Sequence, residues 1–155
     1  MKTSPTGATL STTFWRGRYG KERCSMSDVK CARAMLQAAE RDLLTLRGMT
    51  AGVPEESFGF HVQQAAEKSF KAWLALLGET YPLTHNLEAL LNLLAAQGID
   101  KKPFGKLTGY TPYAVEFRYE GVDSSTEPID RKGALALVEA LLGQVRRELA
   151  KVEGT

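Results

Sequence analysis

Apolar side chains recur every three or four positions over most of the chain after residue 28, which is the spacing of one buried face of an α-helix. The first such run begins behind Ser27 or Asp28 as N-cap and stops at Gly48. A second run opens with Pro54, carries acidic residues in its first turn and continues to Gly78. The pattern therefore predicts two long helices in the first half of the chain.

The second half of the chain predicts three more helices. Thr84 is a suitable N-cap for a helix from His85 to about Gln97, and a short helix is expected from Pro112 to Tyr119. A last helix begins near Thr126 and carries one apolar stripe to Leu149. No alternating pattern is long enough to predict a sheet, and the connections are short. We therefore expect an all-α, up-and-down helical bundle of four main helices plus a short extra helix.

Residues 1–25 interrupt this picture because they are rich in Ser, Thr, Gly and Arg and show no sustained period. We interpret them as a disordered N-terminal extension and residues 26–155 as the bundle domain. One hypothesis makes Met26 the true start of the protein, with the preceding residues an upstream extension. A disordered native tail that begins at Met1 is the alternative.

Composition narrows the class of protein. The 155 residues are 43% hydrophobic and carry a formal charge of +2, which favours a folded core and argues against nucleic-acid binding by net charge alone. Two cysteines, Cys24 and Cys31, and two histidines match no familiar disulfide or zinc spacing. No stretch is long and apolar enough to span a bilayer. We expect a soluble cytoplasmic protein without metal or cofactor and without a membrane anchor.

The polar side of the second helix contains the first candidate site. His61, Gln64, Lys68 and Lys71 follow steps of three, four and three, so they share one stripe. Two ammonium groups and two hydrogen-bonding heads in one stripe can hold a phosphate. The alternative is a solvated helix face in which Glu67 and Lys71 form an ion pair.

His85 is the second candidate, since the expected first turn of a helix disfavours its protonated form and suits a general base. The alternative is a histidine that only helps to close the turn.

A third candidate is a group of aromatic residues around an arginine, which can stack on a base and contact a phosphate. Its members are Tyr110, Tyr113, Phe117, Arg118 and Tyr119. The alternative is a plug between helices that belongs to the core.

Three segments together resemble the HEPN (higher eukaryotes and prokaryotes nucleotide-binding) domain family. They are FHVQQAAEKSFKA at 60–72, YPLTHNL at 81–87 and YAVEFRY at 113–119. The resemblance covers about residues 28–150. It implies a helical bundle, often a homodimer, commonly paired with a minimal nucleotidyltransferase in a two-component, often toxin–antitoxin, system. Many members of the family are metal-independent RNases whose Arg is followed four to six residues later by His.

The chain departs from that RNase motif. Arg47 precedes His61 by fourteen positions, and no arginine lies between His61 and His85. Leu83 stands where related sequences often carry arginine, and Leu87 stands where a tyrosine is modified in some relatives. The resemblance therefore favours a binding protein over an enzyme, with enzymatic activity left open.

Three functions remain in view. The leading one is a component that binds an ATP-like nucleotide, an RNA or a nucleotidyltransferase partner through His61, Gln64, Lys68, Lys71, Tyr113, Arg118 and Tyr119. The second is a metal-independent RNA endonuclease toxin with His85 as base, supported by Arg118 or by an arginine across a dimer. The third is a purely structural partner that masks a nucleotidyltransferase.

Overall fold

The computed structural model describes residues 14–16, 21–24, 28–115 and 127–154, and it describes side chains in the last two ranges. Its α-helices are α1 (Asp28–Gly48), α2 (Glu55–Leu76), α3 (Leu87–Ala96) and α5 (Arg131–Glu153). A 3₁₀ helix, η2 (Lys102–Ala114), completes the bundle. The predicted all-α class is confirmed. Within these residues no helix is long and apolar enough to cross a membrane.

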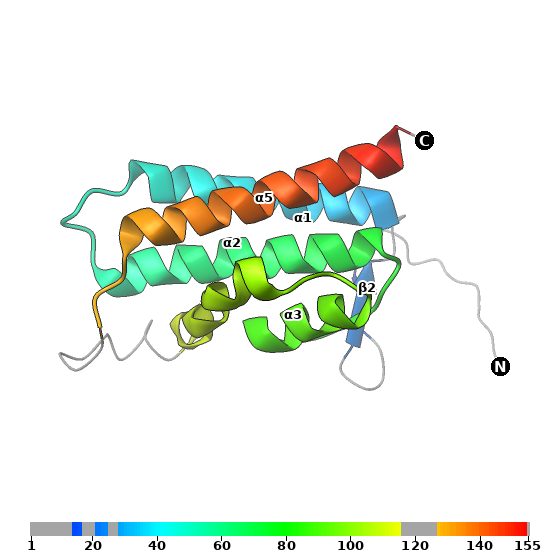
Figure 1. Cartoon of the computed structure of the whole chain (residues 1–155), viewed down its shortest axis with the longest axis horizontal. Coiled ribbons are helices and arrows are strands. Elements are labelled where there is room, and N and C mark those ends of the chain that lie inside the picture. Colours follow the sequence, from blue (N-terminus) through cyan, green and yellow to red (C-terminus); the bar gives the residue numbers. More distant parts are fainter. Residues whose placement is uncertain (1–13, 17–20, 25–27, 116–126, 155) are drawn as a thin grey trace.

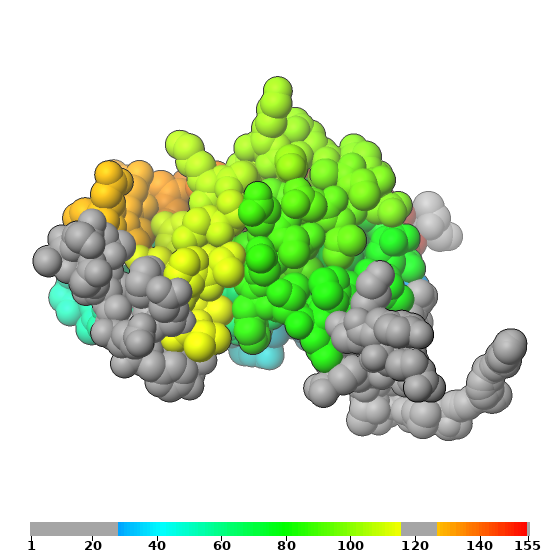
Figure 2. Space-filling view, turned by 90° about the horizontal axis from the view of Figure 1, so that it is seen from below, coloured from blue at the N-terminus to red at the C-terminus, as the bar shows by residue number. Residues whose placement is uncertain are grey.

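Helix α2 lies at the centre of the bundle. It packs against α1 and α5 on one side and against α3 and η2 on the other (Figure 1). Figure 2 shows α3 and η2, in green and yellow-green, covering much of the face seen from below. Small residues let these neighbours approach, among them Gly59, Ala65, Ala66 and Ala72, which are all buried.

The central place of α2 buries two residues of its polar side. Gln63 and Glu67 fall on the polar side of the helix, yet Gln63 is fully buried and Glu67 is only 7% exposed. A helix enclosed on most sides buries part of its polar face as well. Buried polar groups need partners, so these two residues mark where a side-chain network must form.

Two predicted helix starts are corrected. Helix α3 begins at Leu87 with Asn86 as N-cap, whose side chain accepts a hydrogen bond from Ala89 N, so His85 precedes the helix instead of lying in its first turn. Helix α5 begins after Asp130, whose side chain accepts from Gly133 N. In both cases an Asx residue takes the N-cap in place of an upstream threonine.

The short helix expected at 112–119 is wrong in position, because η2 runs over 102–114 instead, and residues 116–119 lie outside the described part. Its apolar side chains recur every three residues, which is the period of a 3₁₀ helix. They are Phe104, Leu107, Tyr110 and Tyr113, all buried or half-buried. Phe104 packs edge-on against Trp73 and Tyr113 lies against Gly59, so η2 runs antiparallel to α2.

A small antiparallel ribbon that the sequence pattern did not predict accompanies the bundle. Strands β1 (Phe14–Arg16), β2 (Lys21–Cys24) and β3 (Tyr81–Pro82) pair in that order. Glu22 lies opposite Tyr81 in the register. Strands β1 and β2 belong to the segment expected to be a disordered extension, and Met26 lies outside the described residues. The division of the chain at residue 26 stays a prediction.

Candidate functional site

Two buried carboxylates organise the polar residues near the centre of the bundle. Asp42 comes from α1 and Glu67 from α2, and each residue is only 7% exposed. A carboxylate out of water is costly unless cations and hydrogen-bond donors surround it. Both residues have such partners, and these include most of the candidate side chains.

Asp42 holds one pair of candidates. Its Oδ1 lies 2.8 Å from His61 Nδ1, and its Oδ2 accepts a hydrogen bond of 2.6 Å from Lys68 Nζ. His61 and Lys68 lie two helical turns apart on α2, so the single carboxylate from α1 spans both. This arrangement joins α1 to α2 and fixes the position of the Lys68 ammonium group.

Glu67 holds a second group. Its Oε2 accepts from Gln63 Nε2 at 2.8 Å and lies 2.9 Å from His85 Nδ1, and its Oε1 accepts from Lys71 Nζ at 3.0 Å. Burial alone would raise the pKa of Glu67, but the charge of Lys71 and the hydrogen bonds from Gln63, His85 and Lys71 outweigh it and lower the pKa. Glu67 is therefore an ionised acceptor at neutral pH.

The ionised Glu67 sets the tautomer of His85. Because a carboxylate can only accept, the hydrogen-bonded Nδ1 of His85 must carry the proton, which leaves Nε2 as the acceptor of a neutral ring. The backbone oxygen of His85 also accepts from Gln63 Nε2 at 3.1 Å. The side chain itself is 59% exposed, so its outer edge faces solvent. A carboxylate behind a histidine and an open ring edge is the geometry of an oriented general base.

Each group lies beside a cavity. One of about 350 Å³ is lined by His85, Thr84, Asn86, Thr111 and residues at the end of η2. The other, of about 320 Å³, lies between α1 and α2 and is lined by Ala34, Met35, Ala38, Glu67, Lys68, Lys71 and Tyr81. The second cavity combines an apolar wall with two ammonium groups. Lys71 Nζ also lies 5.6 Å from the centre of the Tyr81 ring.

The structure brings only some of the predicted site residues together. His61, Lys68, Lys71 and His85 all bind one of the two carboxylates, and Gln64 Nε2 donates to Gln63 Oε1 at 2.7 Å. The expected ion pair of Glu67 with Lys71 is present, but the face is half-buried instead of fully solvated.

Tyr113 lies apart from this network. It is 5% exposed and packs on Gly59 and beside Tyr110, as a core residue does. Arg118 and Tyr119 lie outside the described residues.

Sequence reasoning missed Asp42, Gln63 and Tyr81. Asp42 had a signal, because it falls three positions after Ala39 and so within the apolar stripe of α1. An acid at a core position usually has a buried partner. Tyr81 had no comparable local signal, since its place beside Lys71 depends on how the chain returns after α2.

Metal binding has no support in the described residues, where no group of three or more His, Cys, Asp or Glu side chains could hold an ion. The chemistry available there is that of two lysines, two oriented histidines and the two carboxylates that hold them.

Comparison with known proteins identifies the family. The HEPN domain matches residues 32–148 of the chain, which include both carboxylates, both histidines and the two lysines. Comparisons with curated proteins and with solved structures gave no match. The family match spans well over half of the chain and agrees with the helical bundle described above. The chain belongs to the HEPN domain family.

Proposed function

We propose that this HEPN domain protein binds an ATP-like nucleotide in the cavity between α1 and α2. The observation that carries the proposal is that Lys68 and Lys71 both line this cavity, together with the apolar side chains of Met35 and Ala38 and the ring of Tyr81. Phosphates need cations, and a base needs an apolar or aromatic surface, so this cavity offers both parts of a nucleotide site.

The carboxylates do not remove the two lysines from binding. An ammonium group has three N–H donors, and the contacts with Asp42 and Glu67 use one donor on each lysine. The remaining donors are available to phosphate oxygens. Because the carboxylates also offset the lysine charges, we expect affinity in the micromolar range instead of tight, nonspecific attraction for any polyanion.

Calorimetric titration of the full chain with ATP tests the proposal. Lys68→Ala should abolish measurable binding, whereas Lys132→Ala, which removes an exposed lysine of α5 away from the cavity, should leave it unchanged. A thermal melt of each variant shows that the fold is intact. Equal ATP affinity in Lys68→Ala and the wild-type chain would remove this cavity as the nucleotide site.

The proposal extends to a partner. Membership of the HEPN family supports pairing with a minimal nucleotidyltransferase that carries the nucleotide, in a toxin–antitoxin-like system, and it supports a homodimer. Leu83, two positions before His85, is 39% exposed, and Val115 is 55% exposed. These two side chains offer apolar contact area to a partner chain. Light scattering should give a mass of two chains of 17.0 kDa each, and a monomer at micromolar concentration would contradict the dimer.

A specific observation favours one second function, a metal-independent RNA endonuclease. The observation is the pair of Glu67 and His85, in which the carboxylate fixes the ring and the exposed Nε2 faces solvent beside a cavity of about 350 Å³. Nε2 of His85 would accept the proton of an RNA 2′-hydroxyl as it attacks the adjacent phosphorus, and the 5′-oxygen would leave with a proton from solvent. Among the described residues no arginine lines this cavity, so the cation for the phosphate would come from Arg118 or a second copy.

RNA cleavage in the presence of a metal chelator tests this second function. His85→Ala should abolish cleavage, and His61→Ala serves as the matched control because it removes the other carboxylate-bound histidine. Equal cleavage by both variants would assign the activity to a contaminant. Absence of cleavage by the wild-type chain would leave nucleotide binding as the function.

A further inference from the structure

One amide side chain of α2 is completely enclosed. Gln63 is 0% exposed, although it lies on the polar side of the helix. Its Nε2 donates to Glu67 Oε2 at 2.8 Å and to the backbone oxygen of His85 at 3.1 Å. Its Oε1 accepts from Gln64 Nε2 at 2.7 Å. Both N–H donors of the amide group are therefore used, as a buried amide requires.

These partners permit one orientation of the Gln63 amide group. Rotation of the amide by half a turn would bring Oε1 against the Glu67 carboxylate and the backbone oxygen of His85, so that acceptors would face acceptors. It would also turn an N–H group toward the donor Gln64 Nε2. The hydrogen bonds thus fix the amide from both sides.

Gln63 holds His85 at two points. It binds the backbone oxygen directly, and it binds Oε2 of Glu67, the same oxygen that lies 2.9 Å from His85 Nδ1. The main chain and the ring of His85 are thereby fixed relative to each other. Helix α3 does not hold this residue, because the helix begins only at Leu87.

A fixed ring matters because the side chain of His85 is 59% exposed. An exposed imidazole that nothing holds moves among rotamers, and its neutral form exchanges between the Nδ1–H and Nε2–H tautomers. In the Nε2–H tautomer the outer nitrogen is a donor and cannot take a proton from a substrate. The Nδ1–H tautomer leaves Nε2 as a base at the cavity lined by Thr84, Thr111 and Val115.

We propose that Gln63 is a positioning residue that keeps the ring of His85 in the Nδ1–H tautomer, with Nε2 turned to this cavity. The inference rests on the second function proposed above, RNA cleavage with His85 as the base. Gln63 does not line the cavity, so it acts through Glu67 and through the main chain of His85.

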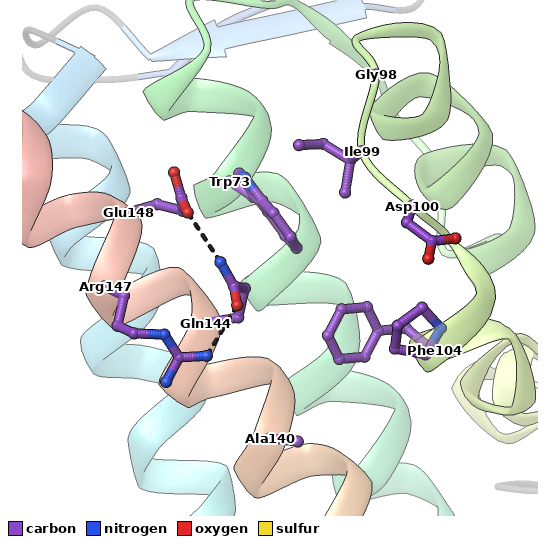
Figure 3. A pocket seen from close by; sticks show the side chains of 10 residues that line it. Trp73, Gly98, Ile99, Asp100, Phe104, Ala140, Gln144, Arg147 and Glu148 are labelled. Atoms are coloured by element: carbon purple, nitrogen blue, oxygen red, sulfur yellow. Dashed lines mark hydrogen bonds between the residues drawn. The ribbon is translucent and has the colours of Figure 1, made fainter.

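A second pair, on α5, has the same hydrogen bond without a histidine and provides the matched control. Gln144 Nε2 donates to Glu148 Oε2 at 2.8 Å, and Figure 3 shows this bond as a dashed line. Gln63→Met and Gln144→Met each remove a bond from a glutamine to the glutamate four residues later, and each keeps an unbranched side chain. The two variants differ in whether a histidine is bound to that glutamate.

Nitrogen-15 NMR of the histidine rings measures the tautomer directly, because His61 and His85 are the two histidines of the chain. At pH 9, well above the ordinary imidazole pKa of about 6.5, the full-length wild-type chain should show His85 as Nδ1–H. Gln63→Met should shift His85 toward the Nε2–H form, whereas Gln144→Met should not. His61, whose Nδ1 is bound to Asp42, should remain Nδ1–H in all three proteins.

An unchanged His85 tautomer in folded Gln63→Met would overturn the proposal, because Glu67 alone would then be sufficient. Thermal melts show whether the variant is folded. The wild-type chain gives a test that needs no variant: the side-chain amide protons of Gln63 should exchange with solvent far more slowly than those of exposed Gln37. Equally fast exchange would show that the amide is not held and would also overturn the proposal.

RNA cleavage in the presence of a chelator separates this inference from the function on which it rests. If the wild-type chain cleaves RNA, Gln63→Met should lower kcat about tenfold at an unchanged KM, because it removes part of the ~10²–10⁴-fold that a general base contributes. A variant as active as the wild-type chain would show that catalysis does not use this positioning. No cleavage by the wild-type chain would overturn the endonuclease function, while the ring spectra still decide whether Gln63 sets the tautomer.

Discussion

At the scale of single residues, Glu67 is the carboxylate that contacts three other side chains of the candidate site. It binds Lys71 at the cavity between α1 and α2 and His85 at the neighbouring cavity, and it accepts a hydrogen bond from Gln63 one turn earlier in α2. A change at Glu67 should therefore affect both cavities at once. Because these partners lower the pKa of Glu67 in the folded chain, its ionisation also contributes to the free energy of unfolding.

We predict that Glu67→Gln is less stable than the wild-type chain at pH 7, and that the difference narrows in acid. The folded pKa of Glu67 lies below its ordinary value of 4.5, so its contribution is present above pH 4.5 and is lost as the pH falls through the folded pKa. Urea unfolding of both proteins between pH 7 and pH 3 measures this. A difference in the free energy of unfolding that stays constant over this range would contradict the assignment.

A second residue-scale prediction concerns Gly59. A methyl group there would overlap the ring of Tyr113. Because this ring is buried between α2 and η2, it has little room to move away. Gly59→Ala should lower the free energy of unfolding by about 1–3 kcal/mol, the usual cost of overpacking a core. Gly109→Ala, where a Cβ would meet open space, is the matched control and should change stability by less than about 0.5 kcal/mol. Equal stability of both variants would show that Tyr113 is free to move.

At the scale of elements, α1 and α5 are matched by charge along their whole length. Arg33, Glu40 and Arg47 follow each other at steps of seven and pair with Glu153, Arg146 and Glu139, which descend at the same step. The sign alternates along each helix. A shift of one helix by seven residues would place like charges opposite each other, so the ion pairs select the antiparallel register more than they add stability.

The middle pair gives the cleanest test of this register. Arg146→Glu places two acids opposite each other, and it should lower the free energy of unfolding by about 1 kcal/mol, since exposed pairs contribute little and like charges repel. The double variant Glu40→Arg with Arg146→Glu should recover most of the loss in a urea titration. Arg41→Glu, at an exposed position of α1 outside the pairs, is the control. If the double variant is no more stable than Arg146→Glu, the pair does not couple the helices.

At the scale of the whole molecule, Arg131 closes one end of the bundle. Its guanidinium donates to the backbone oxygens of Thr50 and Val53, binds Glu55 and lies 4.9 Å from the centre of the Phe58 ring. Burial acts to raise the pKa of Glu55, but the N–H of Ile129 and the guanidinium lower it overall. One side chain at the start of α5 thus holds the connection between α1 and α2.

We predict that Arg131→Met lowers the free energy of unfolding by about 2 kcal/mol, because it removes several charge-assisted hydrogen bonds while it keeps the apolar stem. Urea unfolding measures the change, with Lys132→Met at the neighbouring exposed position as control. ATP affinity should remain unchanged, because Arg131 does not line the cavity between α1 and α2 that we propose for the nucleotide. A variant as stable as the wild-type chain would show that the contacts with Thr50, Val53 and Glu55 add no net stability.

The sequence was sufficient for elements whose pattern is long and regular. Helices α1 and α2 lie close to their predicted bounds because some twenty residues of 3.6-residue period leave little ambiguity. The 3₁₀ helix was misplaced because Gly105, Gly109 and Pro112 pointed to loops, although Phe104 and Leu107 already carried its period of three. Strand β3, of two residues, is too short to leave any pattern.

The candidate site divides in the same way. The stripe of His61, Gln64, Lys68 and Lys71 follows from helix geometry, and the family resemblance follows from the residues around it, so both were available from the sequence by itself. The tertiary structure alone decided that Asp42, 26 positions before Lys68, and His85, 18 positions after Glu67, lie against this helix. Local periodicity places side chains on one face of one helix. The partner on the other side of a hydrogen bond depends on how distant elements pack, because the free energy of burying a charge is settled only when the whole surrounding shell is assembled.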